Sequence, residues 1–253
     1  MFRGHIPQTS PQEHIFSLER HAFQKGELVL MRLSEFLALR RAGRTNQEAF
    51  KASLLVQPCG FDFEAYSRKW ELVRAMESLA GRKLVTRQLD DTNLLRVYKY
   101  SKQTFWNNGW SASPWLLKAR GIVLDAAGNI VSHPFDKTFN YAENGTGLDI
   151  ADDHKVVAVD KLNGFLGIAS RHPHKRGELL LHTQGGFGGP FVEYIRQYAY
   201  EKDVRSSISR FLAKHDVTLM FEVLHPDDPH IIEYAPEMMG IHLIGIRGKS
   251  LCD

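Results

Sequence analysis

Residues 159–168 read VDKLNGFLGI, an apolar run that contains one lysine, Lys161, followed by the pair Asn163-Gly164. Apolar residues on both sides of the lysine predict a strand, and Asn-Gly is typical of a turn. A lysine in such a strand either points outward to solvent or points inward, where burial and nearby cations lower its pKa. In the second case its neutral amine becomes a usable nucleophile. The stretch therefore predicts a strand and a turn, and leaves both orientations of Lys161 open.

The same signals extend over the chain from about residue 94 onward. We expect strands at LLRVYKYS (94–101), RGIVLD (120–125), NIVSHPF (129–135), KVVAVDKL (155–162), GFLGIAS (164–170), ELLLHTQ (178–184), VTLMFEVLH (217–225), HIIEY (230–234) and IHLIGIR (241–247). Two helices are expected between them, from Pro190 to about Glu201 and from Asp203 to about His215. Strand runs with inserted helices predict an α+β domain over residues 94–253 with largely antiparallel sheets.

Residues 1–93 are expected to form a mainly helical N-terminal region of unknown role. Thr45-Asn46-Gln47-Glu48 has the spacing of a capping box. Asp62 is expected to cap a helix that Gly81 ends in a left-handed conformation. The apolar face of this helix recurs at three- and four-residue steps, in Phe63, Tyr66, Trp70, Val73, Met76 and Leu79. Such a stripe predicts a helix packed on the body of the protein rather than a cofactor site.

Composition limits the class of protein. The chain has 253 residues, of which 43% are hydrophobic, so a sizeable core is expected. Its formal net charge of +3 does not by itself indicate a nucleic-acid binder, although it leaves room for a local basic groove. The two cysteines, Cys59 and Cys252, lie far apart in sequence, which favours free thiols and a cytoplasmic protein. No membrane span and no signal peptide are expected.

Six short segments carry a resemblance to a known superfamily. Lys161-Leu162-Asn163-Gly164 resembles the Lys-x-Asp/Asn-Gly signature of the covalent nucleotidyltransferases, which include DNA ligases, RNA ligases and mRNA capping enzymes. Arg120-Gly121 resembles the strand that precedes this lysine, and LHTQGGF (181–187) the small-residue segment that follows it. Phe221-Glu222-Val223 resembles the third signature, and LIGIR (243–247) the strand after it. FDKTFNYAEN (135–144) resembles a segment of phage-type, tRNA-repairing RNA ligases, so the sequence is most similar to that branch.

The resemblance implies a fold and a reaction. The implied fold is a nucleotidyltransferase (ATP-grasp-like ligase) adenylation domain. Lys161 would attack the α-phosphorus of ATP and hold AMP as a lysyl phosphoramidate. AMP then passes to an RNA 5′-phosphate, and an RNA 3′-hydroxyl displaces it. The implied activity is therefore that of an ATP-dependent RNA ligase in RNA repair, with nicked tRNA as a candidate substrate.

Roles for other residues follow from the same resemblance. Arg120 and Lys137 are candidates to neutralise the triphosphate, since guanidinium and ammonium groups suit phosphate oxygens. Glu222 lies in a run whose alternation places Met220 and Leu224 on its own face, so its carboxylate needs a partner, implied to be the ribose hydroxyls. A salt-bridged core glutamate is the alternative.

The nucleotide-binding set is completed by residues near the two signatures. Phe139 is the candidate for stacking on adenine and Asn140 for a polar contact, with a core residue and a turn residue as the alternatives. Asn163 and Gly164 are included as members of the lysine signature.

Magnesium is the expected cofactor, because carboxylate and phosphate oxygens suit it. Alternation places Asp160 on the opposite face from Lys161, so no metal ligand is assigned. The histidines in RHPHKR (171–176) and HPDDPH (225–230) are expected to lie in solvated turns rather than to bind a metal.

Two further signatures of the resembled family are not found in this sequence: a Glu-Gly-x-Val segment and a Lys-x-Lys pair. Loss of such groups would remove electrostatic stabilisation of the transferred phosphate. Three interpretations therefore stay open. The chain is an RNA ligase adenylation domain, a noncatalytic nucleotide- or RNA-binding module, or one part of a split ligase completed by a partner chain.

Overall fold

The computed structural model describes residues 42–44, 63–151, 153–229 and 231–251. The chain divides into two compact units, Met1–Arg68 and Lys69–Asp253, and almost all described residues belong to the second. The expected capping box at Thr45, the helix cap at Asp62, and both cysteines lie outside the described residues. The second unit contains both sheets and every candidate site residue.

Every strand pair of the described chain is antiparallel. In chain order the elements are α4 (Phe63–Gly81), β1 (Val85–Leu89), β2 (Leu95–Tyr100), α5 (Lys102–Trp106), the 3-10 turns η2 (Gly109–Ala112) and η3 (Pro114–Lys118), β3 (Arg120–Asp125), β4 (Ile130–Ser132), η4 (Glu143–Gly145), β5 (Phe165–Arg171), β6 (Leu179–His182), α6 (Pro190–Ala199), α7 (Lys202–Lys214), β7 (Val217–Leu224), η5 (Pro236–Met238) and β8 (Gly240–Gly248).

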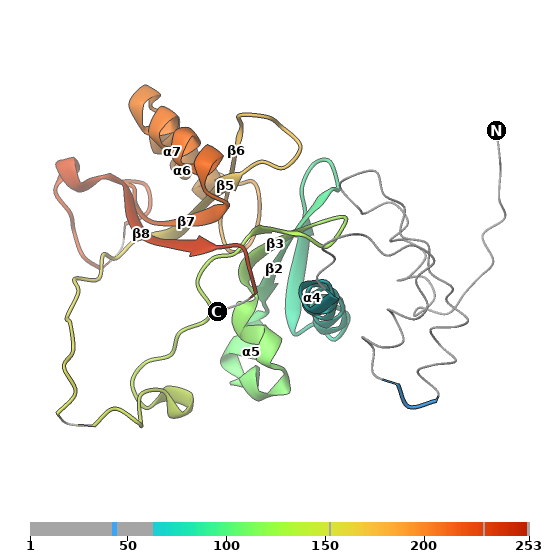
Figure 1. Cartoon of the computed structure of the whole chain (residues 1–253). Coiled ribbons are helices and arrows are strands. Elements are labelled where there is room, and N and C mark those ends of the chain that lie inside the picture. The colour runs from blue at the N-terminus through green and yellow to red at the C-terminus, as the bar shows by residue number, and fades with distance from the viewer. Residues whose placement is uncertain (1–41, 45–62, 152, 230, 252–253) are drawn as a thin grey trace, which may run out of the picture. The chain divides into compact units, whose positions relative to one another are not determined.

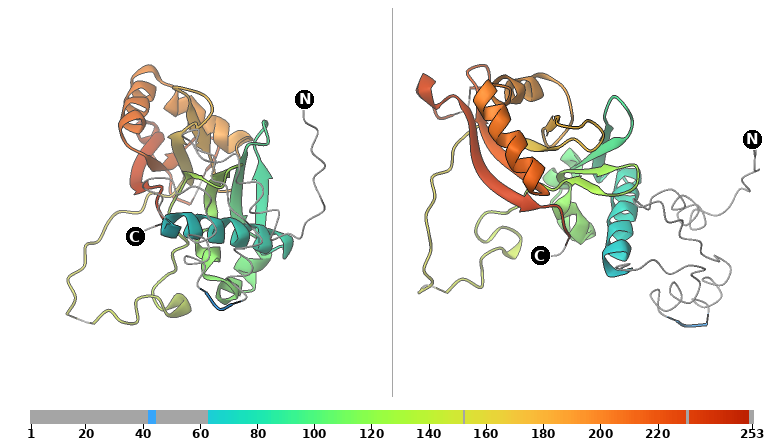
Figure 2. Two further views of the ribbon diagram at one scale, coloured as in Figure 1. Left: turned by 45° about the vertical axis from the view of Figure 1, so that its right-hand side comes forward. Right: turned by 45° about the horizontal axis from the view of Figure 1, so that its top comes forward.

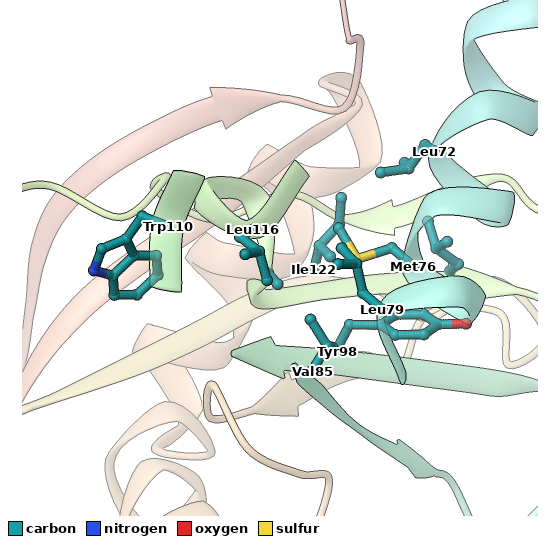
Figure 3. Close-up of a cluster of buried hydrophobic side chains, with 10 residues drawn as sticks. Leu72, Met76, Leu79, Val85, Tyr98, Trp110, Leu116 and Ile122 are labelled. Carbon is teal, nitrogen blue, oxygen red and sulfur yellow. The ribbon is translucent and has the colours of Figure 1, made fainter. Parts of the chain in front are cut away.

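The first sheet has the strand order β1-β2-β3-β4. Helix α4 covers one of its faces through a buried stripe of three- and four-residue spacing, Leu72, Met76 and Leu79 (Figure 3). These side chains pack on Tyr98 of β2 and Ile122 of β3, with Val85, Trp110 and Leu116 in the same cluster. The stripe keeps the α4 helix and the first sheet in one hydrophobic core.

The second sheet has the order β6-β5-β7-β8, with helices α6 and α7 over one of its faces (Figures 1 and 2). The helices contribute Ile195, Ala199, Ile208 and Leu212 to a core whose sheet side includes Ala169, Leu181, Leu219, Phe221 and Val223. On the opposite face, Met220 packs with Leu166, Ile168 and Phe135. The alternation expected along residues 217–224 is therefore confirmed.

The two sheets meet through buried contacts that include polar groups. Leu180 of β6 packs with Leu95, Val97, Val123 and Val131 of the first sheet. His182 of β6 is fully buried and its Nε2 lies 2.9 Å from Ser132 Oγ of β4, while Nδ1 lies 2.9 Å from the Thr183 carbonyl oxygen. Burial lowers the pKa of His182 to about 4, so the imidazole is neutral at neutral pH.

Gly121 of β3 allows the two sheets to approach closely. Its φ is +98°, and a Cβ at this position would lie 2.9 Å from the Gln184 Cα and 3.1 Å from Ile168 Cδ1. A side chain would therefore be strained by backbone conformation and by crowding. The glycine of the Arg120-Gly121 pair is needed for packing, independently of any role of the arginine.

Most of the expected elements are present. The α+β class, the antiparallel sheets and the two inserted helices are confirmed. Strand β1 lies within the region expected to be mainly helical, and its pairing with β2 crosses the predicted domain boundary at 93/94. Helix α4 ends at Gly81 as expected, but the left-handed residue is Lys83, with φ +60°.

Two expected strands are wrong. Residues 155–162 and the described part of HIIEY, residues 231–234, form no strand. Both have the apolar composition of a strand, but neither has a neighbouring strand to pair with in the described chain. Residues 133–164, which we call the β4–β5 connection, contain only the short turn η4 as regular structure where they are described, and Figure 1 shows this yellow-green segment leaving both sheets.

Candidate active site

Lys161 lies on the β4–β5 connection, and its side chain is exposed. The apolar neighbours that predicted a buried strand are exposed as well, with exposed fractions of 77% for Val156, 89% for Val157 and 82% for Val159. Within the described chain, the Lys161 Nζ has one hydrogen-bonding contact, at 3.5 Å from the carbonyl oxygen of Leu162. Of the two orientations left open by the sequence, the structure has the solvent-facing one. The amine is accessible to a substrate.

The next two residues, in contrast, are held by side chains from distant parts of the chain. The Gly164 N–H donates to Glu222 Oε1 at 2.8 Å, and the Asn163 N–H donates to the Tyr234 hydroxyl at 2.8 Å. A Cβ at position 164 would lie 2.1 Å from the Val223 carbonyl oxygen, so only glycine fits beside β7. The lysine signature and the third signature, some 60 residues apart in sequence, are thus brought into direct contact.

Glu222 is half-buried on β7, between Leu166 of β5 and His242 of β8 in the sheet register. Within the described chain its carboxylate accepts one hydrogen bond, from Gly164, and forms no ion pair. The salt-bridged glutamate considered as an alternative is therefore not what the described residues form. Its second oxygen can accept a hydrogen bond from a ligand hydroxyl.

A pocket of about 310 Å³ adjoins Asn163 and Gly164. Its walls combine apolar side chains with carboxylates, an imidazole and a phenol, from Leu224, His225, Pro226, Asp228, Pro229, Ile232, Glu233, Tyr234 and Met239. The His225 ring stacks on Tyr194 of α6 at 3.8 Å between ring centroids, which fixes this end of β7 against the helix. The volume and mixed lining suit part of a small organic ligand.

Arg120 lies at the start of β3, where its Nη1 donates to the Asp136 carbonyl oxygen at 3.4 Å. The Asp136 carboxylate lies beside it and binds Lys118 at 3.2 Å and Arg247 at 2.7 Å. Burial alone would raise the pKa of Asp136, but the Arg247 hydrogen bond and the Lys118 charge outweigh it and lower the pKa. Residue 136 therefore holds three cations close together, two through its carboxylate and Arg120 through its backbone.

Lys137, Phe139 and Asn140 follow Asp136 in the chain, and Phe139 packs against the core of the first sheet. The Lys137 Nζ donates to the Thr138 carbonyl oxygen and lies 4.2 Å from the Phe139 ring centroid. Phe139 packs edge-on against Trp110 at 5.4 Å and belongs to the core around α4. Asn140 is exposed, and its backbone bonds Glu143 in a turn. No hydrogen bond or ring contact joins these three residues to Gly164 or Glu222 within the described chain.

No group of three metal-binding side chains occurs among the described residues. The His172 Nδ1 accepts hydrogen bonds from the backbone N–H groups of His174 and Lys175, so this cluster is a turn, as expected. Asp160 is exposed beside Lys161. In the part of the chain that the structure describes, no helix is long and apolar enough to cross a membrane.

Tyr234 and Asp136 are the positions that sequence reasoning missed. Tyr234 contacts Asn163 across 71 residues, and it was expected to lie in a strand of its own. Asp136 was not selected, although it directly precedes Lys137, a candidate site residue, and a carboxylate next to an expected basic site residue is a recognisable signal. Nothing in the sequence around Tyr234 signals its hydrogen bond to Asn163.

Comparison with known proteins agrees with the motifs. The family model described as RNA ligase matches residues 118–251, which is more than half of the chain. A Thermovibrio ammonificans protein named "Putative RNA ligase" is 28% identical over 171 residues, which are 66% of this chain and 42% of that protein. The chain thus matches less than half the length of this relative. The family match includes β3, the lysine signature and Glu222, and on this ground the chain belongs to the RNA ligase family.

Proposed function

We propose that the chain is the adenylation domain of an ATP-dependent RNA ligase, with Lys161 as the nucleophile. The observation that carries the proposal is the hydrogen bond between Gly164 and Glu222, because it joins the two signatures that the resemblance predicts to share one nucleotide. Membership of the RNA ligase family supports the same reaction class. The nucleotidyltransferase fold and the adenylation domain at 94–253 are part of the proposal.

In the proposed first step, the Lys161 amine, after losing its proton to solvent, attacks the α-phosphorus of ATP. A phosphorus–nitrogen bond forms, the bond between the α-phosphorus and the bridging oxygen breaks, and pyrophosphate leaves. The exposed position of Lys161 gives the amine access to the triphosphate. The fixed Asn163-Gly164 segment limits how far the lysine backbone can move.

The later steps would transfer AMP to RNA. An oxygen of the RNA 5′-phosphate attacks the AMP phosphorus, and the phosphorus–nitrogen bond breaks to regenerate the amine. An RNA 3′-hydroxyl then attacks the activated 5′-phosphate, its proton is released, and AMP leaves. Repair of cleaved RNA, including nicked tRNA, is the proposed role, supported by the resemblance of residues 135–144, and the cytoplasm is the proposed location, supported by the two widely separated cysteines.

The side chains have distinct proposed roles. Glu222 accepts a ribose hydroxyl with the oxygen that Gly164 does not use. Arg120, held by the Asp136 carbonyl oxygen, and Lys137 offset charge on the phosphates. Phe139, Asn140 and Asn163 are proposed to complete the nucleotide site. Because Phe139 packs on Trp110, any stacking on adenine uses the ring surface that this core contact leaves uncovered.

Magnesium is proposed as the cofactor. The described residues form no cluster of three carboxylate or imidazole ligands, but Mg²⁺ is commonly held by one or two carboxylates together with substrate phosphates. No protein ligand is assigned; the exposed Asp160 carboxylate beside Lys161 is compatible with an ion that arrives with ATP and is held mainly by its phosphates. When bound, the ion would neutralise charge on the triphosphate.

The test is incubation of the purified chain with α-labelled ATP and magnesium, followed by intact mass. We expect wild type to gain one AMP, in an acid-labile bond, and Lys161→Ala to gain none. Lys155→Ala is the matched control, because Lys155 is an exposed lysine of the same connection, and it should label as wild type does. No adduct in a folded wild-type sample that binds ATP would contradict the proposal and favour a binding module. An adduct that requires a second polypeptide would identify one part of a split ligase.

A further inference from the structure

A second pocket lies at the far end of β5 from the lysine signature. It measures about 260 Å³ and lies between the β5–β6 hairpin and helix α7, lined by Arg171, Arg176, Gly177, Glu178, Leu179, Ser209, Leu212 and Ala213. The hairpin reads RHPHKRGE over residues 171–178, so three of its eight residues are arginine or lysine. None of its residues belongs to the candidate nucleotide site.

Two guanidinium groups line this pocket without an acidic partner. Arg171 and Arg176 are exposed, and within the described chain neither side chain forms a hydrogen bond or an ion pair. The one carboxylate of the lining, Glu178, instead pairs with Arg205 of α7 at 3.5 Å. A pair of arginines around one hollow, with the local carboxylate engaged elsewhere, is complementary to an anion with several oxygens.

Helix α7 extends the positive surface beyond the pocket. Arg210 and Lys214 are exposed one turn apart, and Arg210 lies three residues before Ala213, which lines the pocket. Ser209 adds a hydroxyl to the lining, and Asp203 is the sole acidic residue of the α7 sequence. The positive groups therefore follow a line rather than a point, which suits a chain of phosphates better than a single small anion.

The position of this surface fits a substrate that also reaches Lys161. Strand β5 begins next to Gly164 and ends at Arg171, so at about 3.3 Å per residue the two sites lie about 20 Å apart along the strand. At about 3.4 Å per stacked nucleotide, roughly six nucleotides span that length. We propose that Arg171 and Arg176, with the basic side of α7, bind the phosphates of single-stranded RNA several nucleotides away from the reacting end. The proposal rests on the RNA ligase function proposed above.

The experiment measures binding of 5′-phosphorylated single-stranded RNA of about 20 nucleotides, a length that exceeds this span, as a function of salt. We expect Arg171→Gln/Arg176→Gln to weaken binding about tenfold at low salt, and to reduce the slope of log affinity against log salt by about 1.4, two contacts at about 0.7 each. Arg74→Gln/Arg82→Gln is the control, because it removes the same charge from exposed arginines near the other sheet. The control variant should bind the RNA with an affinity within about twofold of that of wild type.

Three results of the binding measurements would overturn the proposal. The first is an equal loss of RNA affinity in the control variant, and the second is no loss of RNA affinity in the Arg171/Arg176 variant. The third is that the Arg171/Arg176 variant loses binding to anionic phosphatidylserine vesicles to the same extent, which would indicate a general polyanion-binding surface. Lysyl-AMP formation from ATP alone is measured in the same variants and should be unchanged. If wild type forms no lysyl-AMP while RNA binding still depends on Arg171 and Arg176, the ligase proposal fails and the RNA-binding surface stands. A loss of lysyl-AMP in the Arg171/Arg176 variant would show a structural role instead.

Discussion

The two sheets and the β4–β5 connection differ sharply in how their residues are held. The sheets are paired, covered by helices and buried where they meet, whereas the connection has no strand and exposes Val156, Val157 and Val159. Yet six of the eight proposed site residues lie on the connection, and only Arg120 and Glu222 come from strands. The candidate site therefore lies mainly on a segment that is attached to the rest of the fold at three holding points: Gly164 by Glu222, Asn163 by Tyr234, and Asp136 by Lys118 and Arg247.

This difference separates two kinds of substitution. Changes at the holding points should affect both the free energy of unfolding and lysyl-AMP formation. These residues attach the β4–β5 connection to the rest of the fold and also position the candidate site. Changes at Lys161 should affect the reaction alone, because its side chain has a single weak contact in the described structure. Substitutions at the holding points and at the sheet interface test this division, beginning with the largest expected effect.

Gly164→Ala should break the attachment of the connection to β7. The added Cβ would lie 2.1 Å from the Val223 carbonyl oxygen, so backbone must shift, at a cost of about 3 kcal/mol or more of unfolding free energy. Urea denaturation measures the loss, and lysyl-AMP formation should fall with it. Gly188→Ala is the control, because a Cβ there meets nothing within 4 Å. Similar stabilities for the two variants would contradict the contact between Gly164 and β7.

His182→Gln tests the sheet interface. The folded-state pKa of His182 is lowered to about 4, below the ordinary value of about 6.5, so the unfolded chain binds the proton more readily. The contribution of neutral His182 to the free energy of unfolding is fully present above about pH 6.5 and is lost as the pH falls toward 4. The resulting change in the free energy of unfolding is about 3 kcal/mol at most. Burial also lowers the pKa of His133 to about 4 and lowers the pKa of His172, so the variant should lose only part of the wild-type pH dependence in that window.

The measurement for His182 is the unfolding free energy at several pH values between about 4 and 7. Ser132→Ala is the control, because it removes the hydroxyl next to Nε2 and keeps the imidazole. It should lower stability at every pH and keep the wild-type slope. If the unfolding free energy of His182→Gln changed with pH as steeply as that of wild type, His182 would not be a source of the pH dependence.

Glu222→Ala and Glu222→Gln distinguish the hydrogen bond to Gly164 from the charge of the carboxylate. Alanine leaves the partly buried Gly164 N–H without its acceptor, which should cost about 2 kcal/mol of unfolding free energy. Glutamine keeps an acceptor oxygen in place and should cost less than half as much. Urea denaturation of both variants checks this. Equal losses would mean that the charge, rather than the hydrogen bond, holds the connection.

Tyr234→Phe should have the smallest effect. It removes one hydrogen bond to the Asn163 N–H, a loss of about 1 kcal/mol, or about fivefold in the rate of lysyl-AMP formation. Tyr141→Phe is the control, because Tyr141 is 73% exposed on the same connection and its hydroxyl has no hydrogen bond within the described chain. Equal rates in the two variants would show that Tyr234 does not position the lysine segment.

The sequence predicted the sheets better than the connection, for a physical reason. Alternation along residues 217–224 reports two different environments on the two faces of a strand, and the structure has both. The apolar composition of residues 155–162 was misleading, because a strand also needs a partner for its backbone groups and the described chain offers none there. Local pattern therefore identified β7 and placed Glu222 on the correct face, but it could not place Lys161.

The sequence allowed a candidate site to be proposed where residues lie in a signature, but not where residues meet across the fold. Glu222 and the Lys161 segment were chosen from separate motifs, and their contact through Gly164 supports that choice. Tyr234 enters the site by a hydrogen bond between residues 71 positions apart, and nothing in its surrounding sequence signals this. Phe139 was open between adenine stacking and core packing, and its contact with Trp110 shows that at least one edge serves the core.

Strand β8 has a practical consequence for work with this polypeptide. It lies at the edge of its sheet and exposes three large apolar side chains, Leu243, Ile244 and Ile246, at 54%, 44% and 50%. An edge of this length and composition offers backbone hydrogen bonds and apolar surface to any other extended segment in solution. Samples at high concentration should therefore sediment as larger species than dilute ones, and affinities are best measured at the lowest concentration that the signal allows.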